Sequence, residues 1–483
     1  MITLETDKIY SVSDAEEIIE ESIKRGTCFK SKGLQYYNSI CAFDIETTTI
    51  TYNEELHSVM YLWQFAITDT AHKRNIVYMG RTWKTFDIIV SAINDACIDN
   101  DYVVVYVHNL SYEMQFLSGV YDFTNENVFC VKPHKILKSV YGHIEFRCSM
   151  LHSNMSLEKW TQNLKVDHAK LSGEKFDYSI TRYPWTPLTE YELSYGCNDV
   201  LGVIESIDTE LTRDNDTLYS IPLTSTGYVR RNVKEAMKVI AHQLVQVQLE
   251  LKMDVYILLK ECFRGGDTHA NRYFTNRILY NVHGYDRSSS YPDTILNNPF
   301  PMTQFRRNSF IKTMDDIIED LEVRERACSC RIAIYNYYQE DYYNGFPYLS
   351  YSKCRHVLNP VLDNGRILSA DYLETSVTDI DLRIIIKEMG SEGFIVPIDY
   401  YSAKYYQLPE QLKDEVRKYY KGKTELKGID SQKYYYDKSK KAGQDIYGLM
   451  VQDACKQSIL FDDCEYNDDN IPLEELLKRY NKK

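Results

Sequence analysis

Apolar and polar residues follow two periods along the first half of the chain, and these predict an α/β arrangement. Runs rich in β-branched and aromatic residues predict strands, and spacings of three and four predict amphipathic helices. The strands are expected at 40–45, 59–68, 76–79 and 102–107, and the helices at 13–25, 85–98 and 189–207. This order favours a mixed sheet with helices beside it.

The second half has a different pattern, which predicts a separate α+β domain. A polar, turn-rich stretch at 208–226 is typical of a linker. After it we expect a long amphipathic helix at 228–248, short strands around 281–285 and 327–335, a helix opened by Thr378 and Asp379, and helical segments up to residue 450.

Length and composition narrow the class of protein. A chain of 483 residues with 44% apolar and 26% charged residues is expected to fold into about two to four domains. The longest apolar run, 103–107, is far shorter than the roughly 20 residues of a membrane span, and the N-terminus has no signal pattern. We therefore expect a cytoplasmic protein, in the host cell if a phage encodes it, with no membrane partner. The 12 scattered cysteines favour reduced thiols over disulfides or a zinc site.

Charge is distributed unevenly. The net charge of −14 argues against a protein that coats nucleic acid without specificity, yet residues 411–443 carry ten Lys or Arg and five acids. Five tyrosines lie among these cations and could stack on bases, as in single-strand binders: Tyr419, Tyr420, Tyr434, Tyr435 and Tyr436. A solvated helix face explains the same segment equally well.

Four acids have the spacing of a metal-dependent nuclease. Asp44 and Glu46 alternate on a strand and so share a face, where two carboxylates repel each other unless a cation such as Mg²⁺ or Mn²⁺ lies between them. An exposed edge strand is the alternative. Glu113 follows the buried strand, and Tyr195 and Asp199 share a helix face at positions i and i+4. Together they match a two-metal site, in which the Tyr195 phenol would orient the attacking water.

These segments resemble the three exonuclease motifs of the family B DNA polymerases, of the protein-primed type found in phages and linear plasmids. The matching segments are Asp44-x-Glu46, Asn109-x-x-Tyr112-Glu113 and Tyr195-x-x-x-Asp199. The resemblance implies an RNase H-like 3′–5′ exonuclease domain, with a two-metal site on Asp44, Glu46 and Asp199 and with Asn109 and Tyr112 at the DNA. The second motif usually ends in Asp, and Glu113 departs from it.

Further positions would hold the single-stranded primer end. Ser156 and Leu157 resemble the family's Ser/Thr-Leu segment, although Ser156 also fits a helix N-cap. Tyr178 is expected to position the substrate. A lysine that the family places nearby corresponds to Lys170 or Lys175.

The later sequence resembles a partial polymerase palm and fingers. Phe263, Gly265 and Gly266 resemble the Tyr-x-Gly-Gly turn that approaches the template. The segment 286–292 resembles motif A, which implies that Asp286, at a strand end, holds two Mg²⁺ ions. Nucleotide-binding residues implied by motif A are Ser289, Ser290 and Tyr291.

The segment 440–448 resembles motif B, but two of its residues are substituted. Lys440 and Tyr447 keep the motif's spacing and would contact the incoming nucleotide, and Gly448 would lie at the DNA. Gln444 and Asp445 replace Asn-Ser, and the added acid should repel a triphosphate. The third polymerase motif, Tyr-x-Asp-Thr-Asp, is not found after motif B, nor are the later Lys-x-Tyr segment and the thumb.

The resemblance gives a domain plan and three functional hypotheses. The plan is an N-terminal appendage (1–37), an exonuclease domain (38–207), a helical linker (208–260), a palm with an inserted region (261–432) and a fingers segment with a truncated C-terminus (433–483). The first hypothesis is a protein-primed DNA polymerase with proofreading. Its partners would be primer–template and single-stranded DNA, deoxynucleoside triphosphates, a terminal protein and a separate chain that supplies the missing carboxylate. The others are a stand-alone 3′–5′ exonuclease with a degenerate polymerase half, and a non-catalytic replication partner.

Overall fold

The chain is a mixed α/β protein made of two units. The computed structural model describes residues 12–25, 28–31, 33–52, 54–69, 74–98, 100–173, 177, 179–240, 250–341, 346–453, 455, 459–461, 472, 474–475 and 478. Contacts divide the chain into a first unit, Met1–Val229 with Ile429–Tyr434 and Gln457–Asn470, and a second unit, Arg230–Gly428 with Tyr435–Lys456 and Ile471–Lys483. Among the described helices, none is long and apolar enough to cross a membrane.

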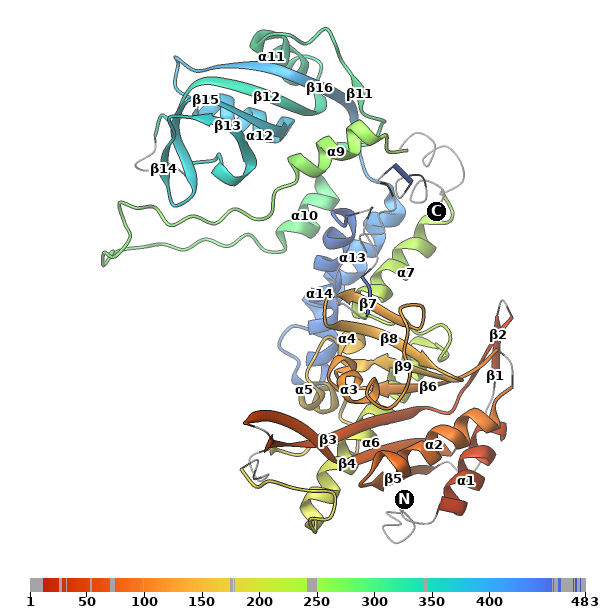
Figure 1. Cartoon of the computed structure of the whole chain (residues 1–483). Coiled ribbons are helices and arrows are strands. Elements are labelled where there is room, and N and C mark those ends of the chain that lie inside the picture. Colours follow the sequence, from red (N-terminus) through yellow and green to blue (C-terminus); the bar gives the residue numbers. More distant parts are fainter. Residues whose placement is uncertain are drawn as a thin grey trace. The chain divides into compact units, whose positions relative to one another are not determined.

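A mixed sheet forms the centre of the first unit (Figure 1). Its strands are β1 (Cys28–Ser31), β2 (Leu34–Tyr37), β3 (Cys41–Tyr52), β4 (Glu55–Asp69), β5 (Arg74–Gly80), β6 (Asp101–Val107), β7 (Val128–Lys132), β8 (Lys135–Tyr141) and β9 (Ile144–Cys148). The order is β5-β4-β3-β6-β9-β8-β7, with β2 pairing β6 and β1. Pairing is parallel between β3, β6 and β9 and antiparallel toward both ends. The predicted mixed sheet is confirmed.

Helices surround this sheet. They are α1 (Val12–Arg25), α2 (Trp83–Ala96), α3 (Leu110–Leu117), α4 (Ser149–Ser153), α5 (Leu157–Leu164) and α6 (Glu190–Asp214). The next helix, α7 (Ser225–Met237), begins in the first unit and continues into the second. Alternation along β3 sends Cys41, Phe43 and Ile45 into an apolar core that α1 and α2 share. The opposite face of β3 turns its polar residues toward α6, which packs on β3 and β4. This division of β3 between a dry face and a charged face positions the candidate site.

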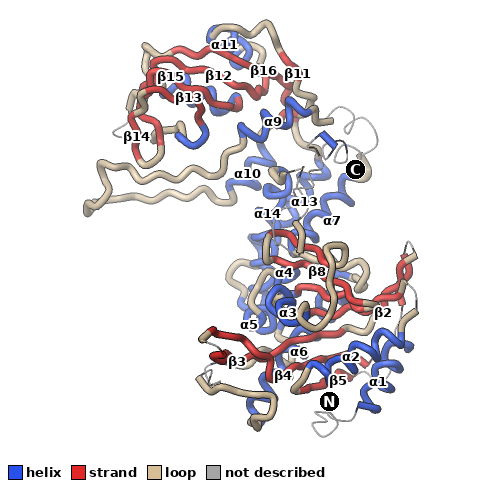
Figure 2. Tube along the Cα trace, in the orientation of Figure 1, coloured by secondary structure: helices blue, strands red, loops and turns tan. Residues whose placement is uncertain are grey.

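The second unit is built on an antiparallel sheet (Figures 1 and 2). Its strands are β10 (Phe300–Pro301), β11 (Arg306–Arg307), β12 (Arg326–Tyr338), β13 (Cys354–Leu358), β14 (Val361–Asp363), β15 (Arg366–Thr378) and β16 (Phe394–Tyr406). Its helices are α9 (Met253–Cys262), α10 (Ser290–Asn297), α11 (Met314–Glu322), α12 (Asp379–Glu388), α13 (Glu410–Glu425) and most of α14 (Lys433–Met450), with a short 3₁₀ turn at Tyr351–Lys353. A second 3₁₀ turn, Asp430–Gln432, and the first two residues of α14 belong to the first unit. Helices α11 and α12 cover the apolar face of the sheet, which is rich in Ile and Leu.

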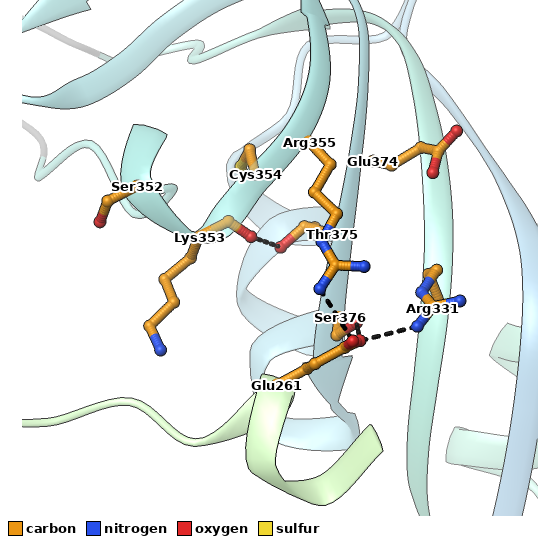
Figure 3. A pocket seen from close by; sticks show the side chains of 9 residues that line it. All are labelled: Glu261, Arg331, Ser352, Lys353, Cys354, Arg355, Glu374, Thr375 and Ser376. Atoms are coloured by element: carbon orange, nitrogen blue, oxygen red, sulfur yellow. Dashed lines mark hydrogen bonds and ion pairs between the residues drawn. The ribbon is translucent and has the colours of Figure 1, made fainter. Parts of the chain in front are cut away.

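Charged contacts hold α9 against this sheet, as Figure 3 shows. The Glu261 carboxylate accepts hydrogen bonds from Arg331, Arg355 and the Ser376 hydroxyl, at 2.8, 2.8 and 2.7 Å. These donors lower the pKa of Glu261, although its partial burial opposes the shift. The end of α9 is therefore fixed to β12, β13 and β15.

Three sequence expectations differ from the structure. Helix α6 runs to Asp214, so residues 208–214 continue that helix instead of forming a linker. Helix α7 ends at Met237, and residues 241–249 of the expected helix at 228–248 lie outside the described residues. Residues 281–285 form no strand. A strand requires a hydrogen-bonded neighbour, and no described strand pairs with this segment.

Candidate functional site

Three carboxylates from two elements meet on the charged face of β3. Oxygens of Asp44 and Glu46 on β3 and of Asp199 on α6 all lie within 4.8 Å of one another. Helix α6 begins at a capping box, in which Thr189 and Glu192 bond each other's backbone amides, and this fixes its start. The predicted convergence of strand acids and a helical acid is therefore present.

Each of two site acids has one oxygen held by a neighbouring side chain. Gln64, directly opposite Asp44 in the β3–β4 register, donates to Asp44 Oδ2 at 2.8 Å. Lys170 Nζ donates to Asp199 Oδ2 at 2.6 Å. The other oxygen of Asp199, Oδ1, is buried and has no hydrogen-bond partner in the described structure. These contacts orient both carboxylates toward the space between them.

Glu113 joins the cluster from a third element. It lies in the first turn of α3, which directly follows β6, and it is 3% exposed. Its carboxyl lies within hydrogen-bonding reach of Asp44, while its Oε2 has no partner in the described structure. Asn109, at the N-cap, adopts the left-handed conformation (φ 82°) that turns the chain from strand to helix. The longer Glu side chain thus reaches the site that the sequence assigned to it.

Burial and mutual repulsion make these acids hard to ionise. Burial and then the Asp199 charge raise the pKa of Asp44 from 3.8 to about 7, against the opposing effects of Lys170 and Gln64. Burial also raises the pKa values of Glu46 and Glu113, and the Asp44 carboxylate adds to both shifts. The pKa of Asp199 rises through burial, although Lys170 opposes the change. The site therefore lacks enough positive charge to stabilise all of these carboxyl groups in their ionised form.

A bound divalent metal ion would supply the missing positive charge. The donors are all carboxylate oxygens, the ligand type that Mg²⁺ and Mn²⁺ prefer. The unpartnered Asp199 Oδ1 lies among them, and a buried polar atom without a partner costs about 1–3 kcal/mol. Asp44, Glu46 and Asp199 can therefore hold a metal ion, as the sequence predicted. The donor set does not distinguish between these two ions.

Aromatic residues line the same region. Tyr195 is 5% exposed, on the face of α6 that carries Asp199, and Lys170 Nζ lies 4.8 Å from its ring centroid. The Tyr112 hydroxyl lies 2.6 Å from Thr47 Oγ1, directly after a register shift between Glu46 and Thr47. Such bulges are frequent beside active sites, because they redirect a strand's side chains.

The expected primer-end residues have mixed outcomes. Ser156 caps α5 by accepting from the Lys159 amide at 3.4 Å, so the N-cap alternative is present, while its side chain stays exposed. Leu157 is buried in the first turn of α5. Tyr178 and Lys175 lie outside the described residues. Of the two candidate lysines, Lys170 contacts the cluster.

In the second unit, the Phe263–Gly266 segment leaves α9 without helix, strand or turn structure. Arg264 donates to Thr375 Oγ1 and the Ser376 carbonyl, at 3.3 and 3.1 Å. A Cβ added to Gly265 or Gly266 would meet nothing within 4 Å, and neither residue has positive φ. The fold itself therefore does not require these glycines, and Phe263 is 45% exposed.

Asp286 does not lie at a strand end, contrary to the sequence expectation. Residues 263–289 run out and back between α9 and α10 without a described helix or strand (Figure 1). Asp286 is exposed there, and it takes no part in the one group of three or more potential metal ligands found among the described residues. The physical reason is the lack of a strand partner described above.

The remaining motif A and motif B residues do come together. Ser290 opens α10, and the Tyr291 ring stacks on that of Tyr447 with centroids 4.1 Å apart and planes at 13°. The Ser289 hydroxyl, in the left-handed turn before α10, accepts from Lys423 Nζ at 2.5 Å. Segments more than 130 positions apart in the sequence thus come together.

Helix α14 carries the other motif B residues. Lys440 is exposed and lies two turns before Tyr447, on the same side of the helix. A Cβ added to exposed Gly448 would meet nothing within 4 Å. The substituted Asp445 lies near Lys441: burial raises the pKa of Asp445, and burial lowers that of Lys441.

Several cations of the basic segment pair with acids in the segment or next to it. Local ion pairs join Arg417 to Glu410 and Asp414 at 2.9 and 2.6 Å. Tyr434 is 4% exposed and its hydroxyl donates to Glu210, so this tyrosine offers no face to a base. Tyr420 remains 40% exposed. The stacking hypothesis is therefore wrong for Tyr434.

Sequence reasoning missed Gln64 and Lys423. The sequence signal was that Gln64 interrupts the apolar run 59–67, and the structure shows that its side chain is fully buried (0% exposed), where an amide needs a polar partner. Lys423 is one of ten cations in its segment, so nothing in the sequence distinguished it.

Comparisons with known proteins give a structural likeness. No family model and no curated protein sequence matches the chain. Among solved structures, it is similar to phi29 DNA polymerase complexed with primer–template DNA and incoming nucleotide, with a TM-score of 0.61, 15% identity, and 85% of this chain and 68% of that chain covered. A complex of the same polymerase with primer–template DNA alone gives a TM-score of 0.59 and 13% identity, with 84% of this chain and 67% of that chain covered. Its complex with single-stranded DNA gives a TM-score of 0.58 and 14% identity, with 84% of this chain and 66% of that chain covered. The chain thus spans about two thirds of those chains, and its fold is related to that of phi29 DNA polymerase.

Proposed function

We propose that the chain is a DNA polymerase of the protein-primed family B type whose first unit is an RNase H-like 3′–5′ exonuclease. The observation that carries the proposal is the group formed by the half-buried Asp44 and Glu46 and the buried Asp199, with Glu113 beside it. The likeness to the fold of phi29 DNA polymerase, which extends over 85% of the chain, supports the proposal. That polymerase is described with primer–template DNA, single-stranded DNA and nucleotides, and we propose these as ligands of this chain.

The nuclease reaction is hydrolysis of the last phosphodiester of a DNA 3′ end. Two divalent ions at this site, when bound, activate a water and stabilise the leaving oxygen. Asp44, Glu46 and Asp199 hold them, and Gln64 and Lys170 fix the orientation of the first and last of these acids. Burial and the Asp44 charge raise the pKa of Glu113, so a bound cation would favour its ionised form. The Tyr195 phenol orients the water.

Fewer observations support the proposed polymerase activity of the second unit. Tyr291 and Tyr447 stack, and Lys423 contacts Ser289, which together form a surface of the kind that holds a nucleotide. Asp286 stands alone on an exposed loop. Synthesis therefore needs a second carboxylate to complete a metal site with Asp286.

A second candidate function is a stand-alone exonuclease with a polymerase half that only binds DNA. Two observations favour it: the exposed position of Asp286, and Asp445 in place of the motif's small polar residue. The test is a primer–template assay with Mg²⁺, with and without deoxynucleotides. Primer shortening in both conditions supports the exonuclease, and lengthening that Asp286→Ala abolishes supports synthesis. No shortening under any condition would overturn both readings.

A further inference from the structure

A hollow of about 740 Å³ opens in the second unit where β11, β12 and β16 lie side by side. Five of its lining residues are cations and one is an acid, Asp320. The cations are Arg306, Arg307, Arg324, Arg326 and Lys404. None of them belongs to the motifs that the sequence singled out.

The strand register forces like charges together. Arg326 on β12 is directly opposite Lys404 on β16, and Arg306 on β11 is opposite Ser402, two residues from Lys404 on the same face. Like charges directly opposite on neighbouring strands destabilise a sheet. The arrangement therefore has an energetic cost unless an anion is shared between the two side chains.

The nearby acids already have other partners. Asp320 accepts from the buried Tyr400 hydroxyl at 3.0 Å and lies 3.6 Å from Arg324. Asp399 pairs with Arg307 at 3.0 Å. In the described part of the chain, no carboxylate pairs with Arg306, Arg326 or Lys404. Three cations of the hollow are therefore uncompensated.

The hollow differs in this respect from the neighbouring pocket of Figure 3. There, Arg331 and Arg355 both pair with Glu261, which ties α9 to the sheet, and Arg331 also pairs with Asp399 at 3.6 Å. That pocket has an evident structural role. The β11–β12–β16 hollow has no such central acid, so its cations remain available to a ligand.

We propose that this hollow, formed around Arg306, Arg326 and Lys404, binds phosphate groups of the DNA backbone, at a site separate from the nuclease cluster and the motif helices. The inference rests on the proposed function. Arginine presents a planar fork of donors that matches a phosphate. Tyr406, 53% exposed, lines the same hollow and adds an aromatic surface beside the cations, a combination typical of nucleic-acid binding.

The main test compares the full chain with a double variant, Arg326→Gln with Lys404→Gln. The control is Lys312→Gln, an exposed lysine of the same unit that does not line the hollow. Binding of a short labelled DNA duplex is titrated at several salt concentrations, with EDTA present so that nothing is cleaved. Losing two phosphate contacts should reduce the slope of log affinity against log salt by about 2 and weaken binding at least tenfold. An unchanged slope would overturn the proposal.

Thermal unfolding gives an independent readout. Without DNA, Arg326→Gln should melt at a higher temperature than the parent chain, because the repulsion with Lys404 is removed. Adding the duplex should raise the melting temperature of the parent more than that of the double variant.

If poly-glutamate stabilises the parent and DNA does not, the hollow binds an acidic protein and the proposal is wrong. If pyrophosphate alone competes as well as DNA at equal phosphate concentration, the site takes free polyphosphate instead, which also contradicts it.

Failure of the proposed function would be visible separately. The same variants are assayed for Mg²⁺-dependent shortening of single-stranded DNA, which depends on the Asp44 cluster and not on the hollow. Absence of shortening in the parent chain would contradict the exonuclease, whatever the binding titration gives. Shortening together with an unchanged salt slope would contradict only the phosphate site.

Discussion

The ammonium group of Lys170 lies 2.6 Å from Oδ2 of Asp199, a residue 29 positions later in the sequence. This contact opposes the burial that raises the pKa of Asp199, and it leaves Oδ1 for a metal ion. A lysine in this position therefore favours the ionised form of a buried carboxylate and holds one of its oxygens.

Replacing this lysine should change both the rate and the pH dependence of DNA cleavage. In Lys170→Met, the pKa of Asp199 rises, so the acidic limb of the pH–rate profile moves to higher pH. The rate at neutral pH should fall about 10–100-fold, the usual cost of losing a residue that orients a metal ligand. Lys84→Met, an exposed lysine of α2, is the matched control. An unshifted profile would show that Lys170 has no role in the site.

Removing a metal ligand should have a larger effect. Asp44→Asn keeps the size of the side chain and its contact with Gln64, but loses the charge. Metal assistance contributes several kcal/mol, so the cleavage rate should fall by about 10³-fold or more. The measurement is single-turnover cleavage of single-stranded DNA, with circular dichroism to confirm folding. A folded variant with the parent's rate would favour the non-catalytic replication partner.

Gln64 offers a milder test of the same geometry. Gln64→Leu removes the 2.8 Å hydrogen bond to Asp44 while keeping a side chain of similar volume in the sheet. The concentration of Mn²⁺ needed for half-maximal cleavage should rise about 10–100-fold. At saturating metal, the rate should approach that of the parent. A variant with an unchanged metal requirement would show that Gln64 serves packing alone.

The cluster also predicts how stability depends on pH. Asp44 has a folded-state pKa of about 7 against an ordinary 3.8, so the folded state holds its proton more tightly than the unfolded state. Its contribution to stability is complete below the ordinary value and is lost as pH rises through 7. In EDTA, the melting temperature should therefore fall between about pH 5 and 7.5. Added Mg²⁺ or Mn²⁺ should restore it at pH 7.5 much more than at pH 5. Equal stabilisation at both pH values, or none, would contradict a metal at these acids.

The stacked tyrosines allow a prediction for the second unit. Stacked aromatic pairs contribute about 0.5–1.5 kcal/mol beyond their buried area, so Tyr447→Leu should lower the free energy of unfolding by about this amount. Tyr447→Phe keeps the ring and should match the parent. Urea unfolding of both variants measures the difference. A Phe variant as unstable as the Leu variant would assign the effect to the hydroxyl and not to the stack.

The parts of the site that follow local rules were predictable from the sequence. Strand alternation places Asp44 and Glu46 on one face, and helical spacing places Tyr195 with Asp199. The partners that depend on register were not: Gln64 meets Asp44 only because β4 pairs with β3 in one particular alignment.

In the second unit, local sequence patterns were less informative. Val282 and Tyr285 favour a strand at 281–285, but this propensity is realised only where a neighbouring strand supplies hydrogen bonds. The stacking of Tyr291 on Tyr447 depends on how α10 and α14 pack, which no local pattern reports.

The most direct test of the central claim is a cleavage assay on a 5′-labelled single-stranded DNA with the purified full chain. The account predicts stepwise shortening from the 3′ end that requires Mg²⁺ or Mn²⁺, stops in EDTA and is lost in Asp44→Asn. Shortening that persists in Asp44→Asn, or a parent chain that leaves the DNA intact with either metal, would contradict it.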